Sequence, residues 1–224
     1  MVKRKKFIQN SRSIVDAAKF LGNNNINGPK SGNISVRKGL GFLITPSGID
    51  YESITAKEIL NLDQKGNVTK LTDIQPSSEW RIHRDVYIAR PEINAIVHTH
   101  SVKATALSCL GIEIPSFHYM VAIAGGNNVR CARYATFGTQ RLSKYALKAL
   151  ENRYACLLSN HGVIALGKSL ENAVDLAIEI ELLAAQYLSA LTIANPNILS
   201  KKEMEKIVKR FKFYKEGKSL PNEE

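Results

Sequence analysis

Hydrophobic and polar positions follow two periods along the chain, one typical of helices and the other of short strands. Residues 7–21 carry apolar side chains at helical spacing, and Asn23-Asn24-Asn25 ends this helix. Residues 33–37 and 41–45 have the character of strands, and the tight turn Lys38-Gly39 lies between them. The first part of the chain therefore predicts one helix followed by a β-hairpin.

Further on, helices interleave with short apolar strands. Ser77 or Ser78 is a suitable N-cap for a helix that stops at Pro91. The apolar residues before His98 and before His161 are typical of buried strands. The remaining expected elements are helices at residues 56–60, 102–108, 138–150, 170–193 and 203–214, and a strand at 67–70.

This order of elements predicts the fold class. Helices that interleave with strands linked by hairpins favour an α/β fold of three layers, with a central mixed, mostly antiparallel sheet and helices on both faces. The chain has 224 residues and no repeat or linker, so we expect a single domain over residues 1–224.

Composition narrows the cellular setting. Hydrophobic residues make up 44% and charged residues 23% of the chain, which is typical of a globular protein. No apolar run approaches the roughly 18–20 residues that span a membrane. The basic N-terminus does not lead into a signal-peptide core, and Cys109, Cys131 and Cys156 are widely scattered. We therefore expect a cytoplasmic protein with no membrane partner.

The formal net charge of +11 raises the question of nucleic acid. The positive charge is concentrated at the two ends of the chain, and no helix-turn-helix, RRM or zinc-finger spacing occurs. A solvated surface is the simplest interpretation. Among functional ones, attraction of a phosphorylated substrate is favoured, and we expect no nucleic-acid partner.

Two histidines separated by one residue are the main chemical signal. On a strand His98 and His100 point to the same side, where they form two corners of a site for a borderline divalent ion such as zinc. His161 follows a second buried strand. Three histidines at strand ends leave a position open for water or substrate, as in catalytic zinc sites. The alternative, that these are ordinary core or surface histidines, stays open on this pattern alone.

Three turns suggest an anion site. Ser31-Gly32-Asn33, Pro46-Ser47-Gly48 and Ser77-Ser78 offer hydroxyls, an amide or open backbone N–H groups, and the last lies where a helix N-terminus favours negative charge. Glu79 follows directly. In the first turn of a helix a glutamate usually complements the dipole, but beside a metal it can act as a general base.

These motifs carry a resemblance. Residues 31–37, 44–48, 77–79 with His83, 90–101 and 161–162, together with the helix that begins at Leu170, are similar in order and spacing to the class II aldolase and ribulose-phosphate epimerase family. The match extends from about residue 10 to 215. Residues 117–122, 125–127 and 134–139 resemble the branch that cleaves L-fuculose 1-phosphate. The epimerase branch has an aspartate near His118, whereas no acid lies between Ile114 and Asn128.

The resemblance implies a role for each matching residue. It implies a zinc-dependent lyase with one Zn2+ per subunit, and a homo-oligomer, similar to the family's cyclic tetramer, with shared active sites. Lys30 departs from the pattern, because the family branch has a small hydroxyl residue there. The implied zinc ligands are His98, His100 and His161, and the implied catalytic acid/base, which can also touch the metal, is Glu79. The implied phosphate pocket comprises Gly32, Asn33, Ser47, Gly48, Ser77 and Ser78. By the same resemblance Tyr119 reaches the active site of a neighbouring subunit, and Phe137 and Tyr214 lie on the aldehyde side.

The implied reaction is the reversible cleavage of a ketose 1-phosphate of the L-fuculose 1-phosphate type into dihydroxyacetone phosphate and a short aldehyde such as L-lactaldehyde. Three alternatives stay open: an aldolase for 5-deoxyribulose or methylthioribulose 1-phosphate, a methylthioribulose-1-phosphate dehydratase on the same fold, and a non-catalytic basic binding protein. Glu181 interrupts an apolar helix, and the sequence does not name its partner.

Overall fold

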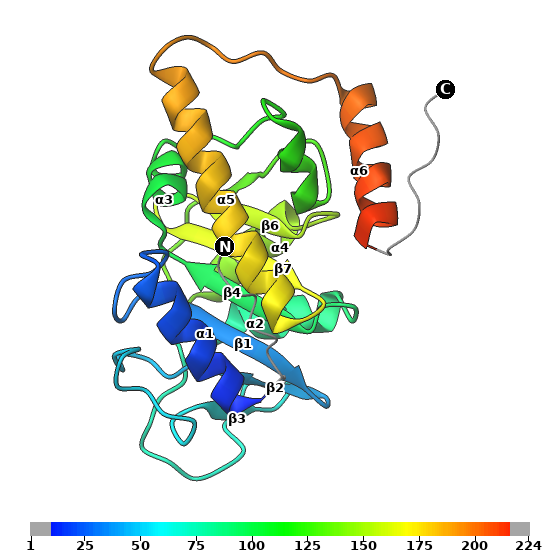
Figure 1. The fold of residues 1–224 in the computed structure, drawn as a ribbon. Coiled ribbons are helices and arrows are strands. Elements are labelled where there is room, and N and C mark those ends of the chain that lie inside the picture. The colour runs from blue at the N-terminus through cyan, green and yellow to red at the C-terminus, as the bar shows by residue number, and fades with distance from the viewer. Residues whose placement is uncertain (1–9, 216–224) are drawn as a thin grey trace.

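A single sheet occupies the centre of the computed structural model, which describes residues 10–215, with side chains through Phe211. In this part of the chain seven strands are hydrogen-bonded in the order β3-β2-β1-β4-β7-β6-β5 (Figure 1). All neighbours are antiparallel except β5 and β6. The strands are β1 (Asn33–Lys38), β2 (Gly41–Ile44), β3 (Leu60–Leu62), β4 (Ala95–Thr99), β5 (Cys131–Ala132), β6 (Ala155–Leu158) and β7 (Gly162–Gly167).

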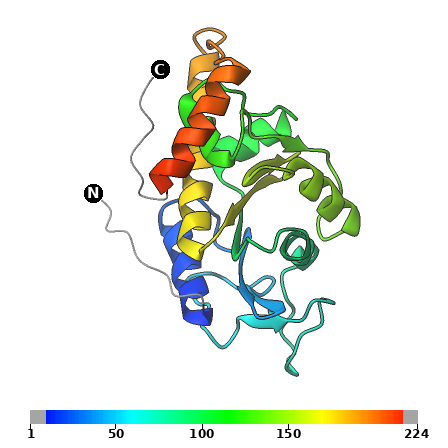
Figure 2. The same cartoon turned by 90° about the vertical axis from the view of Figure 1, so that its right-hand side faces the viewer.

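Helices cover both faces of this sheet. Figure 2 shows α1, α5 and α6 on one side and α2 and α4 on the other, and α3 and η1 pack on the α5 side. The mixed three-layer α/β/α prediction is therefore confirmed. The helices are α1 (Ser11–Asn23), α2 (Trp80–Ala89), α3 (Val102–Cys109), the 3-10 helix η1 (Tyr119–Ala124), α4 (Gln140–Ala149), α5 (Leu170–Leu191) and α6 (Lys201–Lys215).

Strand alternation divides the core into two layers. In β1, Ile34 and Val36 are fully buried in the layer beneath α1 and α5. Ser35, between them, is also fully buried and points to the opposite face, toward α2. Ile96 of β4 joins the α2 and α4 layer. Polar side chains that point to this second face must find partners inside the protein, and this requirement shapes the functional site.

The β1–β2 hairpin is as predicted. Lys38 pairs with Gly41, and Gly39 in the connecting turn has a φ of 58°. This left-handed conformation is one that glycine adopts without strain. The pairing places Asn33, the first residue of β1, opposite His98 of β4.

Two local predictions are wrong. Residues 56–60 form no helix; instead β3 pairs with β2 at the edge of the sheet, where Leu60 and Leu62 are buried. Residues 67–70 form no strand, and their pairing is reduced to one bridge between Val68 and Leu62. In the first case burial of alternate leucines against the sheet outweighs helical propensity.

Helix starts and ends also differ from expectation. Helix α2 begins at Trp80, its N-cap is Glu79, and no side chain caps it. The hydroxyl of Ser77 accepts a hydrogen bond from the Glu79 N–H at 3.4 Å, before the helix starts. Residues 7–9 of the first predicted helix lie outside the described residues. Among the residues that the structure describes, no helix is long and apolar enough to cross a membrane.

Candidate metal centre

His98 is the most firmly held of the three histidines. It lies in the middle of the sheet, with Asn33 of β1 on one side and Ile164 of β7 on the other, and is fully buried. Its Nδ1 lies 2.8 Å from the carbonyl oxygen of Val163. Because a carbonyl only accepts, Nδ1 carries the proton, and Nε2 is left as a lone pair that points into the site.

His100 and His161 complete the cluster. The Nε2 atoms of His98 and His100 are 3.0 Å apart, as expected from their alternate positions at the end of β4. His161 stands at the turn between β6 and β7, and its ring centroid lies 4.8 Å from that of His98 and 5.0 Å from that of His100. The candidate ligand atoms of the three all lie within 4.8 Å of one another.

Glu79 closes the cluster from the start of α2. Its Oε2 lies 2.9 Å from Nε2 of His98, and its Oε1 lies 3.3 Å from Nε2 of His161. Asn33 donates to Oε2 at 3.0 Å. Oε1 is buried, and no described residue makes a hydrogen bond to it.

A cation fits this arrangement. With its Nδ1 proton directed at Val163, neutral His98 turns a lone pair toward the Glu79 carboxylate, so two acceptors face each other at hydrogen-bonding distance. Either a second proton on His98 or a metal ion must lie between them. Three imidazoles with an adjoining carboxylate suit zinc among the common divalent ions, and the carbonyl that holds His98 is a typical support for a metal ligand.

Without a metal ion, the pKa values of the three histidines and Glu79 are shifted by one another and by burial. Burial lowers the pKa of His98, but the charge and hydrogen bond of Glu79 outweigh it and raise this pKa overall. Burial and the neighbouring His98 lower the pKa of His100 to about 3 and that of His161 to about 4. Burial opposes the ionised form of Glu79, yet His98 holds its pKa well below the usual range. Without a metal ion, Glu79 would therefore favour a second proton on His98 in its place.

Two glycines permit the close approach of chain segments around β4. Gly32 has a φ of 72°, and a Cβ there would lie 2.3 Å from the carbonyl oxygen of His98. A Cβ on Gly162 would lie 2.3 Å from the carbonyl oxygen of Thr99 and 2.9 Å from the ring of His100. Larger residues would push the serine-rich turn and the His161 turn away from the cluster.

The cluster of His100, His161 and Glu79 opens into a cleft of about 400 Å³. Its far walls are the serine- and glycine-rich turns that precede β1, follow β2 and precede α2. Every residue of the implied phosphate pocket lines it. The lining residues that bear on function are Lys30, Gly32, Asn33, Ser47, Gly48, Ser77, Ser78, Glu79, His100, Tyr134, Phe137, Asn160 and His161.

Some predicted residues are not brought together in one chain. Tyr119 lies in η1, 52% exposed, and does not line the cleft. Among the described side chains, its ring lies beside those of His118 and Phe211, at centroid distances of 4.8 and 6.4 Å. Tyr214 lies on α6, and its side chain is outside the described part of the protein. Phe137, 66% exposed, stands at the mouth of the cleft.

The structure also identifies supports that the sequence did not indicate. The side-chain oxygen of Asn27 accepts from the backbone N–H of His100 at 2.9 Å. The two carboxylate oxygens of Glu181 accept from the N–H groups of Lys103 and Ala104, at 2.8 and 2.9 Å. Glu181 on α5 thus caps α3, which starts two residues after His100. In the sequence Glu181 stands out only as an interruption of an apolar helix, and no local signal names its partners or marks Asn27, because both contacts join distant segments.

A metal centre of this kind, next to a hydroxyl-lined cleft on an α/β/α sheet, defines a class of metal-dependent enzyme, and comparison with known proteins identifies the family. The family described as Class II Aldolase and Adducin N-terminal domain matches residues 12–188. The chain therefore belongs to the class II aldolase family and is an enzyme of the lyase class.

Named relatives cover nearly the whole chain. A 5-methylthioribulose-1-phosphate/5-deoxyribulose-1-phosphate aldolase of Rhodospirillum rubrum is 47% identical over 93% of this chain and 94% of its own. An L-fuculose phosphate aldolase of Escherichia coli is 46% identical over 91% of this chain and 94% of its own. A solved structure of an L-fuculose 1-phosphate aldolase superposes with a TM-score of 0.88 at 38% identity, covering 95% of this chain and all of that one.

Proposed function

We propose that the protein reversibly cleaves a ketose 1-phosphate into dihydroxyacetone phosphate and a short aldehyde, with one zinc ion per subunit. L-Fuculose 1-phosphate, which would release L-lactaldehyde, is the first candidate substrate. The observation that carries the proposal is the junction of three histidines and Glu79 with a cleft whose other walls are hydroxyl-rich turns. The names of the relatives support a phosphorylated sugar as the substrate class.

The phosphate would lie at the end of the cleft away from the histidines. Ser47, Ser77 and Ser78 line the cleft, and the last two directly precede Glu79, the N-cap of α2, where N–H groups and the helix dipole favour negative charge. Lys30 is the only lysine or arginine among the described residues that line the cleft. We propose that its ammonium group neutralises part of the phosphate charge, which a hydroxyl residue at this position would not do.

Proton movements are assigned to Glu79 and Tyr119. When bound to the three histidines, zinc supplies a Lewis acid that stabilises negative charge on the substrate oxygens beside the bond that breaks. In cleavage, the C4 hydroxyl gives its proton to the deprotonated oxygen of Tyr119, the C3–C4 electron pair passes to the dihydroxyacetone phosphate half, and protonated Glu79 delivers its proton to C3. In synthesis Glu79 removes that proton, and Tyr119 protonates the aldehyde oxygen.

The position of Tyr119 supports a homo-oligomer, for which we propose a cyclic tetramer. A half-exposed tyrosine outside the cleft of its own chain can act only in the site of a neighbouring subunit. Mixing two variants of lowered activity, Tyr119→Phe and Glu79→Gln, then tests the assignment. Mixed oligomers should regain activity, because some sites combine one chain's Glu79 with another chain's Tyr119. Activity that never exceeds that of the separate variants would contradict shared sites.

The first experiment combines metal analysis with a coupled assay for dihydroxyacetone phosphate. One zinc per chain and chelator-sensitive release from L-fuculose 1-phosphate would support the proposal, and kcat/KM on the 5-deoxyribulose and methylthioribulose 1-phosphates would rank the substrates. The relative at 47% identity makes those two sugars a second candidate. Zinc with consumption of methylthioribulose 1-phosphate but no dihydroxyacetone phosphate would identify a dehydratase. If the protein contains no zinc and releases no dihydroxyacetone phosphate from any of these sugars, the proposed function is refuted.

A further inference from the structure

A chain of buried polar side chains extends from Glu79 away from the cleft, between β1 and α2. Asn33 Nδ2 lies 3.0 Å from Glu79 Oε2, and Asn33 Oδ1 lies 2.5 Å from His83 Nε2. On the other side of the imidazole, His83 Nδ1 lies 2.6 Å from Ser35 Oγ, which lies 2.7 Å from the Tyr87 hydroxyl. All five residues are at least 95% buried.

The Glu79 carboxylate and the single proton of a neutral His83 imidazole set the direction of every hydrogen bond in this series of side chains. A carboxylate only accepts, so the Asn33 amide must turn its NH2 group toward Glu79 and its oxygen toward His83. His83 Nε2 must then carry a proton. A neutral imidazole has only one, so Nδ1 accepts from the Ser35 hydroxyl, whose oxygen in turn accepts from Tyr87.

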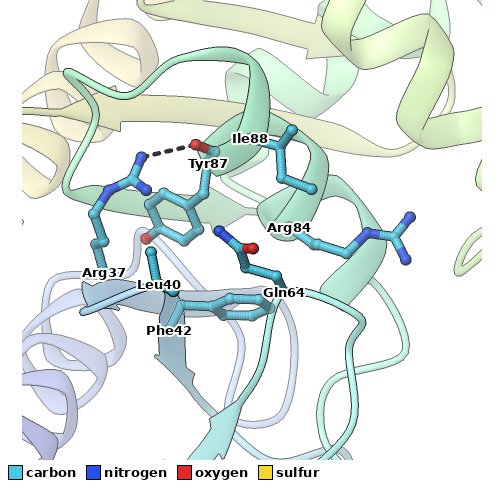
Figure 3. Close-up of a pocket in the computed structure, with 7 residues that line it drawn as sticks. All are labelled: Arg37, Leu40, Phe42, Gln64, Arg84, Tyr87 and Ile88. Carbon is cyan, nitrogen blue, oxygen red and sulfur yellow. Dashed lines mark hydrogen bonds between the residues drawn. The ribbon is translucent and has the colours of Figure 1, made fainter.

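Its surroundings keep His83 neutral. Complete burial, together with the charge on His98, lowers the pKa of His83 to about 3, although Glu79 opposes the shift. The near end of the imidazole faces an amide oxygen and the far end a hydroxyl, and neither is an anion. At the far end of this hydrogen-bonded series of side chains, Tyr87 is fixed by packing on Phe42, while Arg37 donates to the carbonyl oxygen of Tyr87 at 2.9 Å (Figure 3).

We propose that His83 is a positioning residue for Glu79, acting through the orientation of the Asn33 amide. Rotation of that amide by about half a turn exchanges its oxygen and nitrogen at almost no steric cost. The rotated form would turn an oxygen toward the carboxylate and repel it. The Nε2–H of His83 reinforces the first form, because it binds an amide oxygen and not an amide NH2 group, and without it only the carboxylate would orient the amide.

This arrangement matters for the base because the two oxygens of Glu79 have different surroundings. Oε2 is held by Asn33 and approached by His98, whereas Oε1 has no hydrogen bond from any described residue. Fixing one oxygen leaves the other at a defined place toward His161 and the cleft. The catalytic part of this inference rests on the proposed function; the amide orientation does not.

Two amide substitutions test the proposal as a matched pair. In His83→Gln the side-chain NH2 group can occupy the place of Nε2 and still donate to Asn33, whereas in His83→Asn it reaches only the place of Nδ1. Losing a residue that supports a site of this kind costs about 10- to 100-fold in activity. We expect kcat of His83→Asn to fall by about that factor, with KM and zinc content little changed, and His83→Gln to recover most of it. Equal kcat values for the two folded, zinc-loaded variants would overturn the proposal.

A measurement on the unmodified protein removes the dependence on how the variants fold. The chain has five histidines, so 15N-histidine labelling gives few signals, and the signal missing in either variant identifies His83. The expected spectrum has a proton on Nε2 and none on Nδ1 at neutral pH. An Nε2 without a proton would refute the orientation. If no ketose phosphate is cleaved, the proposed function fails, and this spectrum still decides the amide orientation.

Discussion

The cap that Glu181 provides to α3 gives the most quantitative prediction. Glu181→Ala leaves the N–H groups of Lys103 and Ala104, both in the first turn of α3, without their acceptors. A hydrogen bond to a charged group is worth about 1.5–3 kcal/mol when buried. Because Glu181 is only half-buried and water can replace part of the loss, we expect a cost near the upper end of a lost N-cap, about 2 kcal/mol. For a chain of this size that lowers Tm by roughly 4–8 °C.

The assay is thermal unfolding followed by circular dichroism at fixed protein and zinc concentrations, since both shift Tm. Glu181→Gln keeps one acceptor oxygen and should lose about half as much. Glu179→Ala is the control on the same helix, because burial raises the pKa of Glu179 overall and outweighs the favourable charge of His118. A Tm for Glu181→Ala equal to that of Glu179→Ala would refute the capping role.

The remaining predictions concern the site. Glu79→Gln should retain zinc and lose about 100-fold or more in kcat, because general base catalysis contributes at least that factor; near-normal turnover by a zinc-loaded variant would remove the base assignment. Lys30→Thr should raise KM for the phosphorylated sugar by about tenfold, a shift that shrinks in high salt, with kcat unchanged; a salt-independent KM equal to that of the parent would show that the lysine points to solvent. Tyr119→Phe should lower aldol turnover with no change in zinc content, and an unchanged rate would exclude it as the proton donor.

The parts of the site that follow local rules could be read from the sequence. Alternation along a strand put His98 and His100 on one side, and their Nε2 atoms are indeed 3.0 Å apart. The serine- and glycine-rich turns line one cleft with Glu79, as phosphate-binding turns beside a base would. Each of these inferences needs only a period, a turn type or a helix start, all of which lie within a few residues.

Local rules failed where burial decided the outcome. Residues 56–60 have helical composition, but Leu60 and Leu62 are buried at alternate positions of β3, which pairs with β2 at the edge of the sheet. Burial in the sheet therefore outweighs local helix propensity. The isolated strand Cys131–Ala132 is too short for any periodic pattern, and its pairing with β6 supplies the only parallel contact among the described strands. In both cases the strand forms because it pairs with another strand, β2 or β6, that lies outside the local stretch of sequence.

The residues that orient the candidate metal ligands also depend on contacts between distant segments. They explain why the ligands alone do not define the site. His98 is oriented by a carbonyl from β7, His100 by Asn27 before β1, and Glu79 by an amide whose direction depends on His83. Each support lies 46 to 73 residues away from the group it holds, except for His83, which lies close in sequence but acts only through β1. A substitution that spares every ligand can therefore still rotate one amide or loosen one imidazole. Such changes should alter kcat before they alter zinc content, because three imidazoles hold a metal ion even when the neighbouring carboxylate is badly placed.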